Sequence, residues 1–459
     1  MNVSNVLLAA EAVQLQPTDQ QLQLLLQQVL KVLPQAKPQE ASNTVWAVAS
    51  IHRQIPAQQL EPVLQHFMKV LPKANPQDVS NILWAVASMQ QYVPKQHVPE
   101  HQLQQMEQRS VELLAQAKPQ DESNTMWAFG KLQYAPQELL SALEQHPEQL
   151  QALMAASTAQ GLANIAWACG QMGYKGRLAA VLLQQATQVE AGKQGNLKLQ
   201  DLSNLCWAAT VLDLQHSLPQ VLQLAAATGG LWVDRVAETL QQMYQVHLWL
   251  LDSQLPAPNQ GLSGVLSPQQ LQQCKEGWEQ QLALSAQQQV TDLQQSVFAA
   301  VQQLPAGTWQ KQPQLEQRTP DGAFSIDITA TTAAGVQLAI EVDGLSHFIQ
   351  PGNTLEGATQ FRNRALAARG YVVVSIPFWE WDTLRGAEQK HQHLLSKLQP
   401  AVHASRLPAS QPLQQQQQPG QQQQPTGVQA AAAAHAANAA ADTGPALAAR
   451  RRRRKPLSP

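Results

Sequence analysis

Charged residues are scarce in this sequence. Asp, Glu, Lys and Arg make up 14% of its 459 residues, against about 25% in an average soluble protein. The formal net charge is −2, and six of the 30 basic residues stand together at 450–455; without them, 24 basic residues face 32 acidic ones. This balance disfavours a nucleic-acid binder that depends on phosphate charge alone, because that mode needs a strongly basic surface.

Cysteines and long apolar runs are scarce as well. The three cysteines, Cys169, Cys206 and Cys274, are far apart, which excludes a disulfide framework or a zinc ribbon and favours a reducing compartment. No apolar run reaches the ~18 residues of a membrane span, and the first residues lack the features of a secretory signal or a transit peptide. The motifs G-x-x-x-x-G-K-[ST], G-x-G-x-x-G, H-E-x-x-H and G-x-S-x-G are missing too, so we expect no cofactor.

The sequence does contain a repeat of about 40 residues. Five segments align on a tryptophan, at spacings of 38, 43, 40 and 40 residues: EASNTVWAVASI, DVSNILWAVASM, DESNTMWAFGKL, GLANIAWACGQM and DLSNLCWAATVL. Such a period is typical of stacked helix pairs that bury their apolar faces against one another. We predict an α-helical repeat solenoid of about six such units over residues 1–230. Residues 3–10 match the same pattern, which indicates a first unit that is truncated at the given start.

Constant and variable positions of the repeat have different expected roles. The tryptophan and the asparagine three residues before it recur in every unit, so we expect them to be structural; they are Asn43, Trp46, Asn81, Trp84, Asn124, Trp127, Asn164, Trp167, Asn204 and Trp207. Residues four and seven positions after the tryptophan vary and would share one helix face. We predict that this face reads single-stranded RNA by hydrogen bonding and stacking, through Ser50, Arg53, Ser88, Gln91, Lys131, Tyr134, Gln171 and Tyr174. An ordinary solvated helix face is the alternative.

The SN-x-x-WA repeats resemble those of octotricopeptide-repeat proteins and their RAP-domain relatives in chloroplasts and mitochondria. The resemblance covers about residues 1–225 and departs from the pattern by lacking a run of prolines before Glu-Trp. It implies binding of organellar RNA and a part in RNA maturation, stability or translation. Residues 231–314 keep helical patterns without the tryptophan, and we predict a helical spacer there.

Residues 315–398 are predicted to form a small α/β unit. Strand patterns occur at 324–329, 337–342 and 371–377, with a helix near 356–369. The blocks EQRTPDGAFSIDI, AIEVDGLSHF and FRNRALAARGYVVVSIPFWEW, with a closing helix to Leu398, resemble a RAP domain in the same order. This resemblance implies a restriction-endonuclease-like fold, with a mixed sheet flanked by helices.

Carboxylates in this unit leave the question of catalysis open. Asp327 on one strand, Glu341 and Asp343 on another, and His347 have the chemistry of a Mg²⁺ site. The usual nuclease pattern has a lysine two residues after the carboxylate, whereas this chain has an aspartate there. Arg362 or Arg364 would then have to supply the positive charge or contact RNA phosphate. The hypotheses are a Mg-dependent endoribonuclease, a non-catalytic RNA contact surface, and structural ion pairs.

Residues 399–459 are rich in Gln and Ala and end in the basic cluster, so we predict a disordered tail. For the whole chain we predict a sequence-selective RNA-binding factor of the chloroplast, or else of the mitochondrion, that acts beside other RNA-processing or ribosome-assembly proteins. A nuclear location is the alternative that the basic cluster suggests. A protein-binding scaffold is a further alternative, because residues 1–230 carry 13 Lys or Arg against 16 Asp or Glu.

Overall fold

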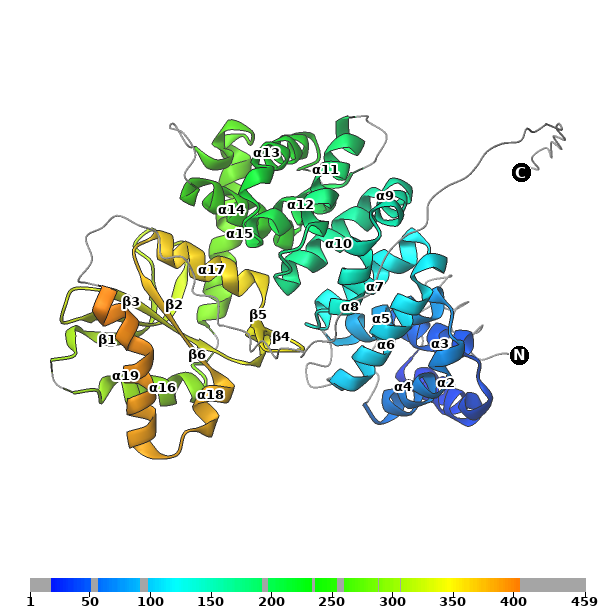
Figure 1. The fold of residues 1–459 in the computed structure, drawn as a ribbon, viewed down its shortest axis with the longest axis horizontal. Helices are drawn as coiled ribbons and strands as arrows, with labels where there is room; N and C mark the ends of the chain where they lie inside the picture. The colour runs from blue at the N-terminus through cyan, green and yellow to red at the C-terminus, as the bar shows by residue number, and fades with distance from the viewer. Residues whose placement is uncertain are drawn as a thin grey trace, which may run out of the picture. The chain divides into compact units, whose positions relative to one another are not determined.

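The computed structural model describes residues 18–50, 57–90, 98–191, 197–232, 236–253, 260–287, 289–305 and 307–404. All of them belong to one compact unit, in which a stack of helices is followed by a small sheet (Figure 1). The expected unit at 3–10, the residues Arg53 and Gln91, and the expected tail after Ala404 lie outside these ranges. The last helix ends at Ala404, so residues 399–404 are helical and do not belong to a disordered tail.

The helices form two layers, which we call the A and B helices. The A helices carry the Trp-Ala sequences, and each packs against the next A helix. They are α3 (Pro38–Ser50), α5 (Pro76–Gln90), α7 (Pro119–Lys131), α10 (Ala159–Met172) and α12 (Leu199–Val211). The B layer consists of α2 (Asp19–Val32), η1 (Leu33–Gln35), α4 (Ala57–Val70), η2 (Leu71–Lys73), α6 (Glu100–Leu113), η3 (Leu114–Gln116), α8 (Gln137–Gln145), α9 (Pro147–Ala156), α11 (Leu178–Ala191), η4 (Gln215–Ser217), α13 (Leu218–Ala227) and η5 (Thr228–Gly230). The predicted helical repeat is therefore present.

Four of the five A helices, all except α10, begin with a common cap. A carboxylate in the first turn accepts the backbone N–H three residues earlier, at 3.0 Å for Glu40, 3.1 Å for Asp78, 3.1 Å for Asp121 and 3.0 Å for Asp201. An acidic group there satisfies a free N–H and lies at the positive end of the helix dipole. This explains the Pro-Gln-acid sequence that starts the first three of these helices.

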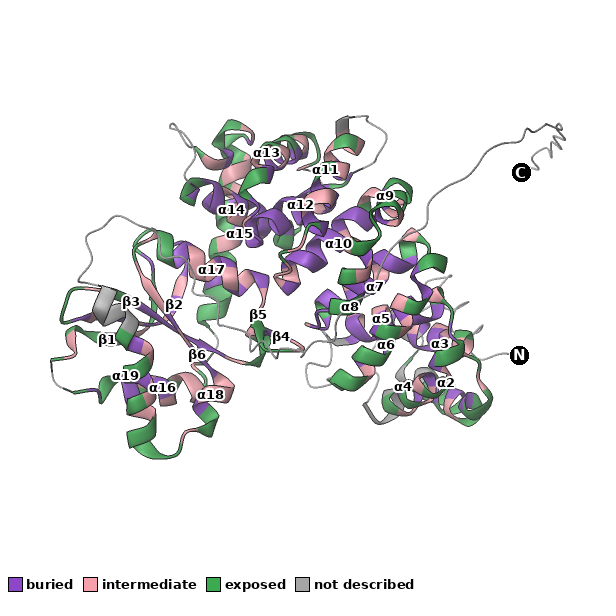
Figure 2. Ribbon diagram, in the orientation of Figure 1, coloured by how far each residue is buried: buried purple, intermediate pink, exposed green. Residues whose placement is uncertain are grey.

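Several of the recurring asparagines and tryptophans contact their counterparts in the next unit. The Asn81 amide donates to the Asn43 carbonyl at 3.4 Å. The ring centroids of Trp46 and Trp84 are 6.0 Å apart, and those of Trp84 and Trp127 are 6.3 Å apart. Such pairs stabilise the stack beyond the apolar area they bury. In the middle of the stack, α10 and α12 are almost entirely buried, as their purple colour in Figure 2 shows.

The stack of A helices continues past residue 230, where the sequence predicts only a spacer. Helix α14 (Ala237–Asp252) packs on α12, and α15 (Pro268–Ala286) packs on α14, with η7 (Gly261–Gly264) between them. Gln242 and Gln245 each stand 38 residues after the Asn and the Trp of the preceding unit. Gln242 donates to Asn204 at 2.9 Å, and the Trp207 indole donates to Gln245 at 2.8 Å. The repeat is hidden here because glutamine replaces both marker residues. None of the described helices has the length and apolarity of a membrane span.

The C-terminal sheet has the strand order β1-β2-β3-β6. Its strands are β1 (Trp309–Arg318), β2 (Ser325–Thr332), β3 (Gln337–Asp343) and β6 (Val372–Pro377). The β1–β2 and β2–β3 pairs are antiparallel and β3–β6 is parallel, so the sheet is mixed, as expected. A hairpin of β4 (Phe348–Ile349) and β5 (Thr354–Leu355) stands apart from it. The helices of this region are α16 (Asp292–Gln302), α17 (Gly357–Ala368), α18 (Phe378–Thr383) and α19 (Gly386–Ala404).

Strand β3 is buried on both faces, and this positions its acidic residues. Leu338, Ile340 and Val342 belong to a core that includes residues of α16 and α19. Glu341 and Asp343 alternate with them and reach Arg362 of α17 on the other face. The predicted strands at 324–329, 337–342 and 371–377 and the predicted helix near 356–369 are confirmed to within a few residues.

Candidate functional sites

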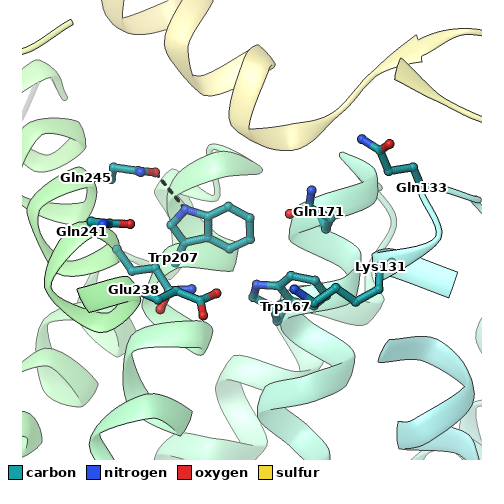
Figure 3. A pocket seen from close by; sticks show the side chains of 10 residues that line it. Lys131, Gln133, Trp167, Gln171, Trp207, Glu238, Gln241 and Gln245 are labelled. Carbon is teal, nitrogen blue, oxygen red and sulfur yellow. Dashed lines mark hydrogen bonds between the residues drawn. The ribbon is translucent and has the colours of Figure 1, made fainter. Parts of the chain in front are cut away.

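Two adjoining hollows lie along the A helices from α5 to α14. One, of ≈ 510 Å³, is lined by Trp84, Ala87, Ser88, Trp127, Lys131, Asn164, Trp167, Gln200, Asn204 and Glu238. The other, of ≈ 380 Å³, is lined by Gly130, Lys131, Gln133, Trp167, Gln171, Trp207, Glu238, Gln241, Gln242 and Gln245 (Figure 3). Because Lys131, Trp167 and Glu238 line both, we treat the two as one groove.

Lys131 is held at the centre of the groove. Its ammonium lies 5.9 Å from the ring centroid of Trp127 and 5.1 Å from that of Trp167, and cation–π attraction favours both contacts. The rings of Trp167 and Trp207 are only 6% and 5% exposed, and their centroids are 6.4 Å apart. These two indoles therefore pack against each other and are largely buried in the wall of the groove.

Amides dominate the polar surface of the groove. An amide side chain both donates and accepts hydrogen bonds, so the lining offers bonds of both kinds with little net charge. Among the residues that line the two hollows, the charged ones are Lys131 and Glu238. Sequence reasoning missed Glu238, Gln241 and Gln245, although the 38-residue step from Trp207 to Gln245 was a signal that could have found them.

The positions four residues after the tryptophan have three different environments. Ser88 and Lys131 line the groove. Gln171 also lines the groove, but its amide donates to Glu356 of the C-terminal region at 2.9 Å. Ser50 ends α3, and its side chain lies outside the described part of the structure.

For Tyr134 and Tyr174, the prediction that the residues seven positions after the tryptophan share this helix face is wrong. Helices α7, α10 and α12 end before these positions, and residues in the left-handed region follow: Gln133 (φ 53°), Gly173 (φ 63°) and Asp213 (φ 57°). The next N–H bonds back to a carbonyl five residues earlier, at 3.0 Å for Tyr134 and 3.0 Å for Tyr174. This is the Schellman turn that closes many helices, and it directs the following side chain away from the helix face.

The two tyrosines that follow these turns are accordingly packed. Tyr134 is 1% exposed, and its hydroxyl donates to the buried carboxylate of Glu107. Tyr174 is half-buried, and burial together with the nearby Glu144 raises its pKa. Tyr134 offers no free face to a nucleobase, so it is a core residue.

The hairpin of the C-terminal region bonds directly to the end of helix α7. The Gln350 N–H donates to the Gln133 carbonyl at 2.8 Å, and the Ala135 N–H donates to the Gln350 carbonyl at 2.7 Å. The Gln133 side chain donates to the Ser346 carbonyl. This backbone bridge places the hairpin at the rim of the groove, where the yellow ribbon passes above Gln133 and Gln171 in Figure 3.

Arg364 joins α17 to the repeat stack. It donates to the carbonyls of Thr210 at 2.9 Å and Val211 at 2.8 Å, which lie at the C-terminal end of α12. Arg369, the residue that follows the end of α17, bonds to Asp252 of α14 at 2.8 Å. Arg364, which the sequence suggested as a phosphate contact, is therefore a helix cap at an internal interface.

The predicted acidic cluster is present, and Arg362 lies inside it. The guanidinium is 3.0 Å from Glu341 and 3.0 Å from Asp343, both of which are fully buried. Ser375 donates to Asp343. Asp327 lies alongside and accepts the Val342 N–H at 2.8 Å. The structure therefore brings Asp327, Glu341 and Asp343 together, with an arginine between two of them.

The electrostatics of this cluster are those of a buried ion-pair network. Burial raises the pKa of Glu341 to about 8, although Arg362 opposes the shift, and burial also raises the pKa of Asp327. His347 shares a hydrogen bond of 2.9 Å with Thr359, and burial lowers its pKa. Within the described ranges, no three or more His, Cys, Asp or Glu side chains are arranged to hold a metal ion. As arranged, the cluster does not fit Mg²⁺, because an ion would have to displace the guanidinium.

Comparison with known proteins links this chain to the RAP domain. Residues 340–397 match the family model of the RAP domain. A RAP domain-containing protein, chloroplastic, of Oryza sativa subsp. japonica is 40% identical over 58 residues. The aligned stretch covers 13% of this chain and 9% of the length of that relative.

Proposed function

Because residues 340–397 form a RAP domain, we propose that this chain is a sequence-selective RNA-binding factor of an organelle, acting in the processing, stabilisation or translation of mRNA or rRNA. The observation that carries the proposal is the amide-lined groove along the A helices, with Lys131 at its centre. The name of the rice relative supports the chloroplast as the organelle. The resemblance of the repeats to octotricopeptide repeats points the same way.

The chemistry of the groove suits the edges of unpaired bases. Sequence-specific RNA recognition acts on single-stranded segments, whose bases expose their hydrogen-bonding edges to side chains. The groove supplies amides, the Ser88 hydroxyl and one ammonium, and it has little positive charge to attract phosphates without regard to sequence. A surface of this kind discriminates among bases better than it binds any polyanion.

The RAP domain packs against the helices that line the groove. It contacts α10, α12 and α14 through α17, and it bonds to the end of α7 through its hairpin. A groove that is already formed does not lose conformational entropy when RNA binds, and this raises affinity. The bound strand would be kept extended, which blocks exonucleases or exposes a cleavage or translation site to other RNA-processing or ribosome-assembly proteins. No bond needs to be broken by this chain.

The proposal is tested by crosslinking the tagged full-length protein to RNA in cells and sequencing the bound RNA, for the wild type and for Ser88→Ala/Lys131→Ala. Lys69→Ala is the matched control, because Lys69 is exposed on the B helix α4. We expect a discrete organellar footprint that the control keeps and the double variant loses. Absence of RNA enrichment for the wild type, or a footprint that the double variant keeps, would overturn the proposal.

The ribonuclease alternative has less support, because Arg362 already compensates the carboxylates that would bind the metal. It predicts Mg²⁺-dependent cleavage of the footprint RNA by the full chain, abolished in Asp343→Asn. The protein-scaffold alternative predicts that the groove variant loses a protein partner while the bound RNA is unchanged.

A further inference from the structure

Lys131 and Glu238 stand on opposite sides of the groove. Glu238 lies in the first turn of α14 and is exposed, whereas Lys131 ends α7, with the A helices α10 and α12 between them. Their charged ends point toward one another over Trp167 in Figure 3. Within the described residues, no ion pair joins Glu238 to Lys131 or to any other cation, and its carboxylate has no hydrogen bond. Two opposite charges thus face a common hollow without neutralising each other.

The hollow of ≈ 380 Å³ around these charges is also lined by the amides of Gln171, Gln241 and Gln245. The Gln171 and Gln245 amides are engaged with Glu356 and Trp207 respectively. Glu238 is therefore the strongest acceptor left for a ligand, and Lys131 is the strongest donor.

This pair of groups matches one nucleobase better than the others. A carboxylate accepts two parallel hydrogen bonds when its partner presents two adjacent donors. Guanine does so with its N1–H and its 2-amino group. Adenine and cytosine present an amino group beside a ring acceptor, and uracil presents a single N–H between two carbonyls. Guanine also carries acceptors at O6 and N7, where a lysine can donate.

We propose that the groove selects a guanine in its RNA, at the nucleotide that lies between Lys131 of α7 and Glu238 of α14. The Glu238 carboxylate accepts from N1–H and the 2-amino group, and Lys131 donates to O6 or N7. Glu238 is then a specificity-determining residue for the RNA-binding function proposed above, on which this inference rests.

The experiment is selection of single-stranded RNA from a random pool by the full-length protein, followed by sequencing of the bound fraction. Wild type is compared with Glu238→Gln, which keeps the size of the side chain and replaces one acceptor by a donor. Glu148→Gln is the matched control, because Glu148 is likewise an exposed acid in the first turn of a helix, α9, away from the groove. The selected RNA is then resynthesised with inosine, which lacks the 2-amino group, at each guanosine in turn.

We expect one invariant guanosine in the RNA selected by the wild type and by Glu148→Gln, and loss of that preference in Glu238→Gln. Inosine at that position should weaken wild-type binding by about tenfold or more, a typical value for a well-formed bidentate pair, and should have little effect on Glu238→Gln. A selected sequence without an invariant guanosine, or one that Glu238→Gln selects equally well, overturns this inference and leaves the proposed function standing. Failure of the wild type to enrich any RNA overturns both.

Discussion

Replacing Arg362 by methionine should destabilise the RAP domain strongly. The guanidinium contacts Glu341 and Asp343 at 3.0 Å each, and neither carboxylate has any exposure to solvent. Methionine keeps much of the side-chain volume but leaves both acids without their cation. Removal of one partner from a buried ion pair typically costs about 3–5 kcal/mol, because the remaining charge stays desolvated.

A second substitution separates the loss of charge balance from the loss of packing. In Asp343→Asn/Arg362→Met the acid that accepts the Arg362 hydrogen bond is neutralised as well, so we expect a substantial part of the stability to return. The assay is thermal and chemical unfolding of the full chain, with the exposed Arg385→Met as control. A change below about 0.5 kcal/mol in Arg362→Met, the range of ordinary surface substitutions, would refute the reasoning, and so would a double variant no more stable than the single one.

The pH dependence of the same cluster provides an independent check. The pKa of Glu341 is raised from 4.5 to about 8 by burial, so the folded chain holds this proton more tightly than the unfolded chain. Stability contributed by this group is therefore fully present below the unfolded pKa and falls as pH rises between the two values. In Glu341→Gln this loss should be absent, and an unchanged pH profile of unfolding would contradict the assignment.

Three further predictions concern the repeat stack and its junction with the RAP domain. Tyr134→Phe should lose about 1–3 kcal/mol in unfolding experiments, through its bond to buried Glu107, with RNA affinity unchanged; reduced affinity at unchanged stability would point to base contact instead. Burial raises the pKa of Glu122 to about 8, so Glu122→Gln should lose less stability than the wild type between pH 6 and pH 9 in thermal melts, and equal losses would contradict this. Gly357→Ala places a Cβ against a backbone carbonyl of α10, and overpacking of this kind costs about 1–3 kcal/mol of stability. Hydrogen exchange of α17 should therefore rise in Gly357→Ala but not in the control Gly344→Ala, where the space is open. Equal exchange in both variants would refute the contact.

Much of the fold follows from local patterns in the sequence. The period of the Trp-Ala segments predicts the stack of helix pairs, and alternation of apolar residues predicts β2, β3 and β6. Strand β1 was not predicted, because it is an edge strand that is mostly exposed and contains Pro313, so it has neither apolar alternation nor strand composition. Helix α14 was missed as a repeat unit because amides can fill the Asn and Trp positions while the helix stacks in the same way.

The site was less predictable because it depends on contacts that are distant in sequence. Lys131 could be found from its place in the repeat. The packing of Tyr134 could not, since Gln133 adopts the left-handed conformation that usually signals glycine. Nor does any periodicity reveal that Arg364 caps α12, because this depends on how the RAP domain docks on the stack.

The junction also limits how the number of repeat units can change. The RAP domain bonds to the end of α7 and packs against α10, α12 and α14, so it fits a fixed run of four consecutive A helices. A unit inserted or deleted between α7 and α14 would shift these partners by a whole repeat and break the junction. The repeat units before α7 take part in none of these contacts. A lineage or a designer could therefore lengthen or shorten the stack of helix pairs at the N-terminal side, one pair at a time, while the C-terminal half stays constant.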